Sequence, residues 1–150
     1  MEQKGSMLLK VMSIIMMVGG ILGAVGSFFV ALFAALGQVA LSSADVQSQL
    51  TTTQSGQAGM IMGLLWVGVV VLIAGAVIEI IAGVKGKNNW NNPAMAKTLM
   101  IWGIICAIVS TIGTILFSTG SGTFQVFSAL TGLVVPVLYI IGSVQLKNQA

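Results

Sequence analysis

AGAVIEIIAGVKGKNNWNNP (residues 74–93) joins an apolar run to a basic turn, and this junction decides the expected fold. The run before Lys85 extends back to Gly59, which is long enough for a membrane-spanning helix, since about 20 apolar residues cross a bilayer. Asn92 and Pro93 are typical of the N-cap and the first position of a following helix. The stretch therefore predicts a crossing helix, a basic turn and a second crossing helix.

The composition of the whole chain agrees with this local pattern. Of 150 residues, 57% are hydrophobic and 6% are charged, and the mean hydropathy is +1.05. A typical soluble domain is about 25% charged, and a small domain leaves much of its surface exposed. Lipid must therefore cover most of this chain. We predict an all-α, multi-pass protein of the cell membrane, with the lipid bilayer as its main partner.

Four apolar segments are long enough to cross the bilayer as helices. They cover about residues 11–36, 59–84, 98–117 and 126–144, so residues 1–150 are expected to form one four-helix transmembrane domain. The first segment could continue to Leu41, because no charged residue lies between Lys10 and Asp45. A helix of that length must tilt strongly or project beyond the membrane.

The lysines determine the expected orientation. All six lie near the N-terminus, in the turn after the second segment, or in the C-terminal tail: Lys4, Lys10, Lys85, Lys87, Lys97 and Lys147. Positively charged connections stay in the cytoplasm, so both termini are predicted to be cytoplasmic. Trp90 suits an anchor at the same interface. The polar connection over residues 42–58 is then the outer loop, where a protein partner could bind.

The residue types argue against most enzyme classes. Histidine is absent, and the three acids Glu2, Asp45 and Glu79 are far apart, so neither a metal site nor a Ser-His-Asp arrangement is expected. The net charge of +3 has no basic cluster that would indicate nucleic acid binding. The single Cys106 cannot form an internal disulfide. We predict a non-enzymatic protein without a metal or cofactor.

Two helix ends are similar at an offset of 60 residues. VIEIIAGVKGKN (residues 77–88) aligns with VLYIIGSVQLKN (residues 137–148), and the alignment places Tyr139 where Glu79 stands. A true duplication would give two helical hairpins in the same orientation, a parallel repeat about an axis along the membrane normal. Chance matches are common in apolar segments, so the sequence leaves the duplication open.

Small residues indicate which helix faces pack, because helices in lipid associate through close contact rather than through the hydrophobic effect. In the first segment small residues recur every fourth position, and in the second they share a face with Glu79. The predicted packing residues are Gly19, Gly23, Ser27, Ala31, Ala35, Gly68, Gly75 and Gly83. The first series could join helices within one chain or join protomers of a homo-oligomer.

Glu79 is a lone acid within an apolar segment, which makes it a functional-site hypothesis. The first role is structural, a hydrogen bond with the Tyr139 hydroxyl that joins the two hairpins. The second role is proton or cation coupling, and the third is the polar lining of an oligomeric pore. Lys10 and Lys97 could also reach toward the carboxylate from the cytoplasmic side.

The sequence favours a small integral membrane protein that self-associates as a channel, a pore or a membrane scaffold. The alternatives are a small proton-coupled transporter that uses Glu79 and an accessory membrane subunit. The layout of four segments with a longer outer connection resembles tetraspan families such as claudins and MARVEL proteins in topology alone, and no family is assigned. Six lysines without arginine favour an AT-rich bacterial source.

Overall fold

The computed structural model describes residues 4–121 and 126–149, and every regular element in these ranges is helical. Side chains are described for residues 7–115 and 132–149. This confirms the predicted all-α class. The elements are α1 (Lys4–Ser42), α2 (Ala44–Gln49), α3 (Thr52–Asn89), the short 3-10 helix η1 (Pro93–Met95), α4 (Ala96–Ser121) and α5 (Val126–Lys147).

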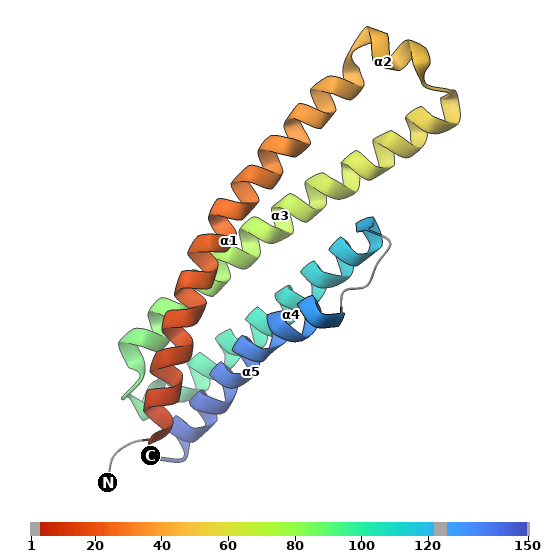
Figure 1. Ribbon diagram of the computed structural model, residues 1–150. Helices are drawn as coiled ribbons and strands as arrows, with labels where there is room; N and C mark the ends of the chain where they lie inside the picture. Colours follow the sequence, from red (N-terminus) through yellow and green to blue (C-terminus); the bar gives the residue numbers. More distant parts are fainter. Residues whose placement is uncertain (1–3, 122–125, 150) are drawn as a thin grey trace.

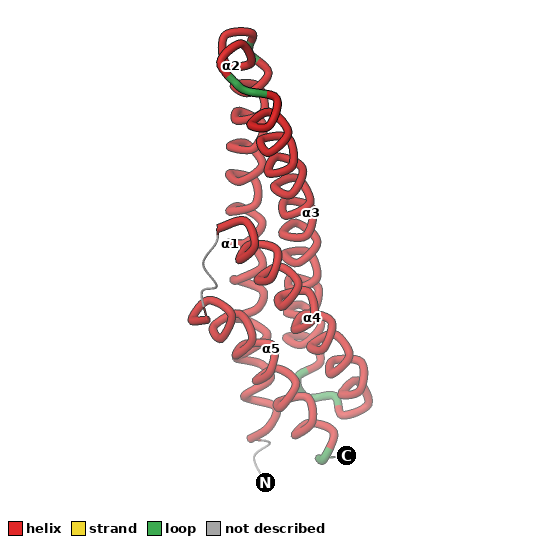
Figure 2. The backbone as a smooth tube through the Cα atoms, turned by 90° about the vertical axis from the view of Figure 1, so that its right-hand side faces the viewer, coloured by secondary structure: helices red, strands yellow, loops and turns green. Residues whose placement is uncertain are grey.

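The four long helices pack as two hairpins, α1 with α3 and α4 with α5 (Figure 1). Further contacts join α1 to α5 and α3 to α4. Both termini lie at the same end of the molecule (Figures 1 and 2). The α1–α3 hairpin projects at the other end, well past the ends of α4 and α5.

This projection follows from the lengths of the helices. α1 has 39 residues and α3 has 38, whereas α4 has 26 and α5 has 22. At 1.5 Å per residue, the first two are roughly 57–58 Å long and the last two roughly 33–39 Å. The hydrocarbon core of a bilayer is only about 30 Å thick. Because the helices lie side by side, one common tilt cannot fit both hairpins to the same bilayer.

Three helical segments are long and apolar enough to cross a membrane: Met7–Ser42, Thr52–Asn89 and Pro93–Ile115. The described apolar part of α5, Gly132–Lys147, is shorter than such a segment. Large apolar side chains on these helices face outward, including Leu22, Phe28 and Phe33, as lipid-facing surfaces require. The fourth crossing, the duplication and the orientation of the termini stay predictions.

The connection predicted over residues 42–58 is largely helical, because α2 lies within it and α3 begins at Thr52. A capping box starts α3 at this point. The Thr51 hydroxyl accepts a hydrogen bond from the Gln54 backbone N–H at 3.4 Å, and the Gln54 side chain accepts one from the Thr51 N–H at 3.1 Å. These bonds satisfy donors that a helix start leaves without a partner. The helix thus begins seven residues before Gly59, where the predicted membrane-crossing segment begins, and that segment stays a prediction.

The turn between α3 and α4 forms as the sequence predicts. The Asn92 side chain accepts a hydrogen bond from the Ala94 backbone N–H at 3.2 Å. Pro93 then opens η1, which leads directly into α4 at Ala96. The Asn-Pro pair therefore begins this helical segment, with one 3-10 turn ahead of the α-helix.

The packed core lies at the end of the molecule that holds the termini. It contains Leu9, Met16, Ala82, Ala96, Leu99, Cys106, Tyr139 and Leu146. Glycines let the backbones approach closely there, since a Cβ on Gly83 would lie 2.7 Å from the backbone of Ser13 and of Met17. A Cβ on Gly142 would likewise lie 3.0 Å from the backbone of Leu9. We call this packed region the base of the bundle.

Among the glycines of α1, Gly20 lies closer to α3 than the predicted Gly19 and Gly23 do. A Cβ on Gly20 would lie 2.8 Å from Ile80 Cγ1 and 2.9 Å from the Ala76 carbonyl oxygen. Gly19 and Gly23 are both exposed. A Cβ on Gly19 would still lie 3.8 Å from Glu79 Oε2, and a Cβ on Gly23 would lie 3.7 Å from Ala76 Cβ, so the predicted ladder borders α3 beside the closer contact at Gly20.

The other predicted packing residues vary in burial. Ser27 is buried on α1, whereas Ala31 and Ala35 are half-buried. On α3, Gly68 and Gly83 are buried and Gly75 is half-buried. The buried line on α1 runs through Met16, Gly20, Ser27 and Ala34, at intervals of four, seven and seven residues. These intervals fit the 3.5-residue period of two helices that wind around each other. Residues spaced strictly by four do not keep to that period, so they rotate gradually out of the contact face.

Candidate intramembrane site at Glu79

The base of the bundle is built around the side chain of Tyr139. A Cβ on Gly86 of α3 would lie 2.7 Å from the Tyr139 ring, and a Cβ on Gly103 of α4 would lie 2.9 Å from it. The aromatic ring of α5 therefore fits between two neighbouring helices only because glycine stands at both positions. Tyr139 is fully buried in this slot.

The Tyr139 hydroxyl donates a hydrogen bond to the Ala82 carbonyl oxygen at 2.9 Å. This bond joins α5 to α3, as the structural hypothesis for Tyr139 requires, but its acceptor is the backbone and not Glu79. The buried hydroxyls of Ser13 and Ser143 bond to carbonyls of their own helices. Within the described residues, no buried side-chain nitrogen or oxygen atom lacks a hydrogen-bond partner. The base is thus closely packed and internally satisfied.

Glu79 lies on α3 three residues before Ala82, on the side of the base that faces the projecting hairpin. Its side chain is half-buried, and its Oε2 atom is 3.8 Å from the position that a Cβ would take on Gly19. Glu79 is also within electrostatic range of the buried Cys106 thiol on α4. Among the described residues, no hydrogen bond or ion pair involves the Glu79 carboxylate. The acid is therefore held among apolar and small groups.

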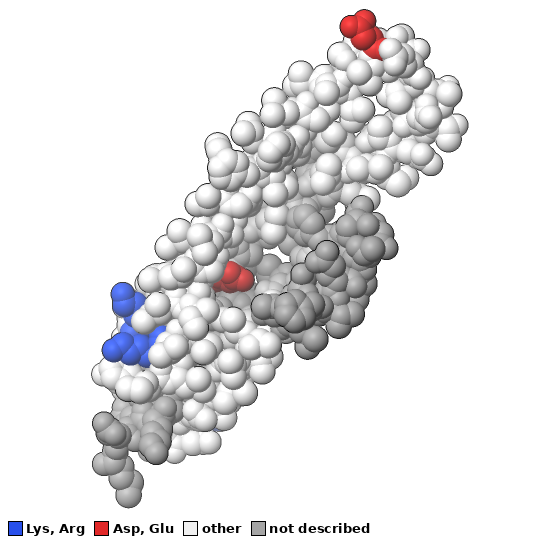
Figure 3. Space-filling view, viewed as in Figure 1, with Lys and Arg blue, Asp and Glu red and all other residues white. Residues whose placement is uncertain are grey.

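The lysines whose side chains are described do not reach Glu79. Lys10 Nζ lies over the Trp90 ring at 4.7 Å from its centroid, and Lys85 Nζ lies over the Trp102 ring at 4.9 Å. Lys87, Lys97 and Lys147 are exposed. The described lysines gather toward the end that holds the termini (Figure 3). The expectation that Lys10 turns toward Glu79 is wrong, because the aromatic ring of Trp90 binds its ammonium group.

Above the base, α1 and α5 separate. A Cβ on Gly26 of α1 or on Gly132 of α5 would meet no heavy atom within 4 Å, in contrast to the close contact of Gly142 with Leu9. In the space-filling view, carboxylate atoms drawn in red are visible at the surface in the middle of the molecule (Figure 3). Glu79 is half-buried, so its side chain is partly accessible among the described residues.

Several residues of this site were not predicted from the sequence. Gly20, Gly86 and Gly142 make close contacts between helices, although nothing in their local spacing separates them from other glycines. At the far end of the hairpin, the Trp66 indole N–H donates a hydrogen bond to the Gln38 side-chain oxygen at 3.0 Å. Gln38 could have been noticed, because amides are rare in an apolar run of this length.

The described residues contain no group of three or more His, Cys, Asp or Glu side chains that could hold a metal ion. The chemistry at Glu79 is therefore that of one carboxylate, which can bind a proton or a cation. Comparisons with known protein families, with curated proteins and with solved structures find no match to this chain. The function must accordingly be inferred from the site itself.

Proposed function

We propose that this chain is a non-enzymatic, four-span membrane protein that acts as a small proton-coupled transporter through Glu79. One observation carries the proposal: a half-buried carboxylate without a hydrogen-bond or ion-pair partner among the described residues lies at mid-bundle. Both termini are placed in the cytoplasm, because all six lysines lie at that end of the predicted topology.

A carboxylate in this position can exchange a bound proton for a bound cation. An ionised carboxylate without a partner is costly in a low-dielectric environment, so either a proton or a cation stabilises it. The two cannot neutralise the same oxygen atoms at once. Competition for Glu79 therefore couples the release of one to the binding of the other, which is the requirement for exchange transport.

The packing of the bundle supports access from one side at a time. Below Glu79 the helices are in close contact at Gly83, Gly86 and Gly103, with the Tyr139 ring between them. Above Glu79, Gly26 and Gly132 have no close neighbours. The proposal takes this arrangement as one state of the transport cycle, and transport then requires a second state in which the base opens.

The proposal is tested with purified protein in liposomes that contain a pH-sensitive dye. Tetraphenylphosphonium, a lipophilic monovalent cation, serves as the probe against an imposed proton gradient. We expect probe-dependent proton movement with the natural chain, its loss in Glu79→Gln and its retention in the control Asp45→Asn, which removes the acid on α2 instead. Equal proton movement in Glu79→Gln and the natural chain would show that Glu79 is not the coupling site.

The second candidate is self-association as a channel or membrane scaffold, and the projecting hairpin favours it. Phe33 and Val39, in the last ten residues of α1, and Met60, in the first ten of α3, are each about 70% exposed. A contiguous apolar surface beyond the lipid is a common mark of a protein interface. Crosslinking through Val39→Cys in membranes should give a dimer or a larger species, whereas a monomer alone would exclude this candidate.

A further inference from the structure

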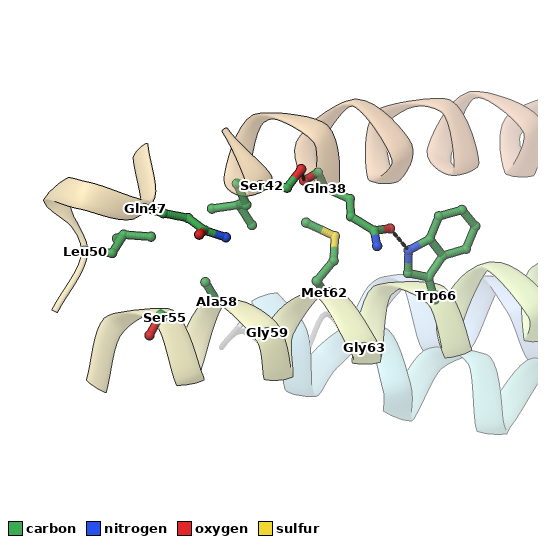
Figure 4. A pocket seen from close by; sticks show the side chains of 11 residues that line it. Gln38, Ser42, Gln47, Leu50, Ser55, Ala58, Gly59, Met62, Gly63 and Trp66 are labelled. Carbon is green, nitrogen blue, oxygen red and sulfur yellow. Dashed lines mark hydrogen bonds between the residues drawn. The ribbon is translucent and has the colours of Figure 1, made fainter. Parts of the chain in front are cut away.

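A groove lies at the far end of the hairpin, between the last turns of α1, the short α2 and the first half of α3 (Figure 4). Its volume is about 440 Å³, which is within the range of roughly 300–1,000 Å³ typical of small-molecule sites. Trp66 closes one end of the groove, and Leu50 lies near the other (Figure 4). Neither Glu79 nor the base contributes to it.

The depth of the groove can be counted along the helices. Met62 is 23 residues before Lys85, or about 35 Å at 1.5 Å per residue, and Gln38 is 28 residues after Lys10, or about 42 Å. The hydrocarbon core is about 30 Å thick, and a bilayer with its headgroups is about 40–45 Å thick. Trp66 is only 19 residues before Lys85, or about 29 Å. If the lysines mark one interface, the groove runs from the edge of the hydrocarbon core at Trp66 into the headgroup layer of the opposite leaflet. Trp66 suits that layer, since tryptophan is enriched at membrane interfaces.

The walls of the groove combine apolar and uncharged polar groups. Leu41, Leu50 and Met62 supply apolar surface, and the Gln47 amide projects between them (Figure 4). The Trp66 N–H donates to the Gln38 oxygen, which fixes the orientation of that amide and leaves the Gln38 N–H donors available to a ligand. Every lining residue is uncharged. The groove thus suits an apolar chain that carries a neutral hydrogen-bond acceptor.

We propose that this groove binds the ester region of one lipid molecule of the outer leaflet, with an ester carbonyl accepting a hydrogen bond from Gln38 and the acyl chains leaving the groove beside Trp66 toward the hydrocarbon core. A site for a phosphate or an anionic headgroup would need lysine or arginine, and the lining has neither. Binding should therefore depend on the ester group and not on the charge of the headgroup. This site is independent of the proposed role of Glu79.

The test is native mass spectrometry of the delipidated full-length protein with defined lipids. Dipalmitoyl phosphatidylcholine and phosphatidylglycerol should bind one to one with similar affinity. The ether-linked analogue of phosphatidylcholine should bind about tenfold more weakly, since it lacks the carbonyl that one hydrogen bond requires. A strong preference for the anionic lipid, or equal binding of ester and ether lipids, would overturn the proposal.

Two glycines of α3 provide a matched pair of variants. Gly59 lines the groove and Gly56 does not, yet a Cβ on either would meet no heavy atom within 4 Å. Gly59→Phe should fill the groove and weaken lipid binding at least tenfold, whereas Gly56→Phe should bind as the natural chain does. Gln38→Leu should remove the discrimination between ester and ether lipids while the apolar wall stays intact. Unchanged lipid binding in Gly59→Phe would also overturn the proposal. So would crosslinked dimers of Gly59→Cys, because they would show that a second copy of the chain covers the groove.

Discussion

The Tyr139 hydroxyl of α5 and the Ala82 carbonyl of α3 are joined by a buried hydrogen bond of 2.9 Å. They meet because Gly86 and Gly103 leave room for the aromatic ring between their helices. Tyr139 thus closes the base of the bundle one turn away from Glu79, without neutralising the acid. The hydrogen bond that closes the base and the Glu79 carboxylate, which has no partner among the described residues, therefore lie on neighbouring turns of α3 and do not involve each other.

Tyr139→Phe should lower the free energy of unfolding by about 0.5–1.5 kcal/mol, because it removes one buried hydrogen bond and keeps the ring. Titration with sodium dodecyl sulfate from a mild detergent, followed by circular dichroism, measures this change. Thr111→Val is the control, since the Thr111 hydroxyl bonds to the Ala107 carbonyl of its own helix at 2.8 Å. An equal loss of unfolding free energy in both variants would mean that the hydrogen bond between α5 and α3 stabilises the protein no more than a bond within one helix.

Gly83→Ala should destabilise the base by about 1–3 kcal/mol, the usual cost of overpacking. The added methyl group would lie 2.7 Å from backbone atoms of α1, which cannot move aside as a flexible side chain can. The thermal unfolding midpoint in detergent reports the effect. Gly113→Ala on α4 is the matched control, because a Cβ there meets no heavy atom within 4 Å. A midpoint lowered equally by both would contradict the close contact at Gly83.

Thr51→Ala should loosen the first turn of α3, because it removes the hydroxyl that caps the Gln54 N–H. Loss of an N-cap costs about 0.5–2 kcal/mol, so the amides of residues 52–56 should exchange with deuterium faster by about twofold to thirtyfold. Amides in the middle of α3 should be unaffected. Unchanged exchange in the first turn would show that the capping box does not determine where α3 begins.

Single cysteines in a Cys106→Ser background test the predicted orientation. In intact cells, a membrane-impermeant maleimide should label Ser43→Cys between α1 and α2, and it should label Asn88→Cys only after the cells are opened. Both positions are exposed, so their access differs only by the side of the membrane. The opposite pattern would place the lysines outside and invert the topology.

The sequence alone indicated the chemical environment of this chain and the character of its helices. Its scarcity of charge, the long apolar runs and the Asn92-Pro93 start depend on residue type and local spacing. Lipid solvation and helix capping act over a few residues, so they can be read along the chain. The capping box at Thr51 was also local, but the polarity of its surroundings concealed it.

Only the tertiary structure decided which side chains meet. The aromatic slot of Tyr139 requires glycines from two other helices, and the Gln38–Trp66 bond joins residues that are 28 positions apart. Small residues occur all along these helices, so their frequency cannot show that α1 meets α3 at Gly20 and leaves Gly19 beside Glu79. Those contacts depend on how each helix is rotated about its own axis and on how far α1 lies from α5. Both are set by the packing of all four helices together, which local sequence does not contain.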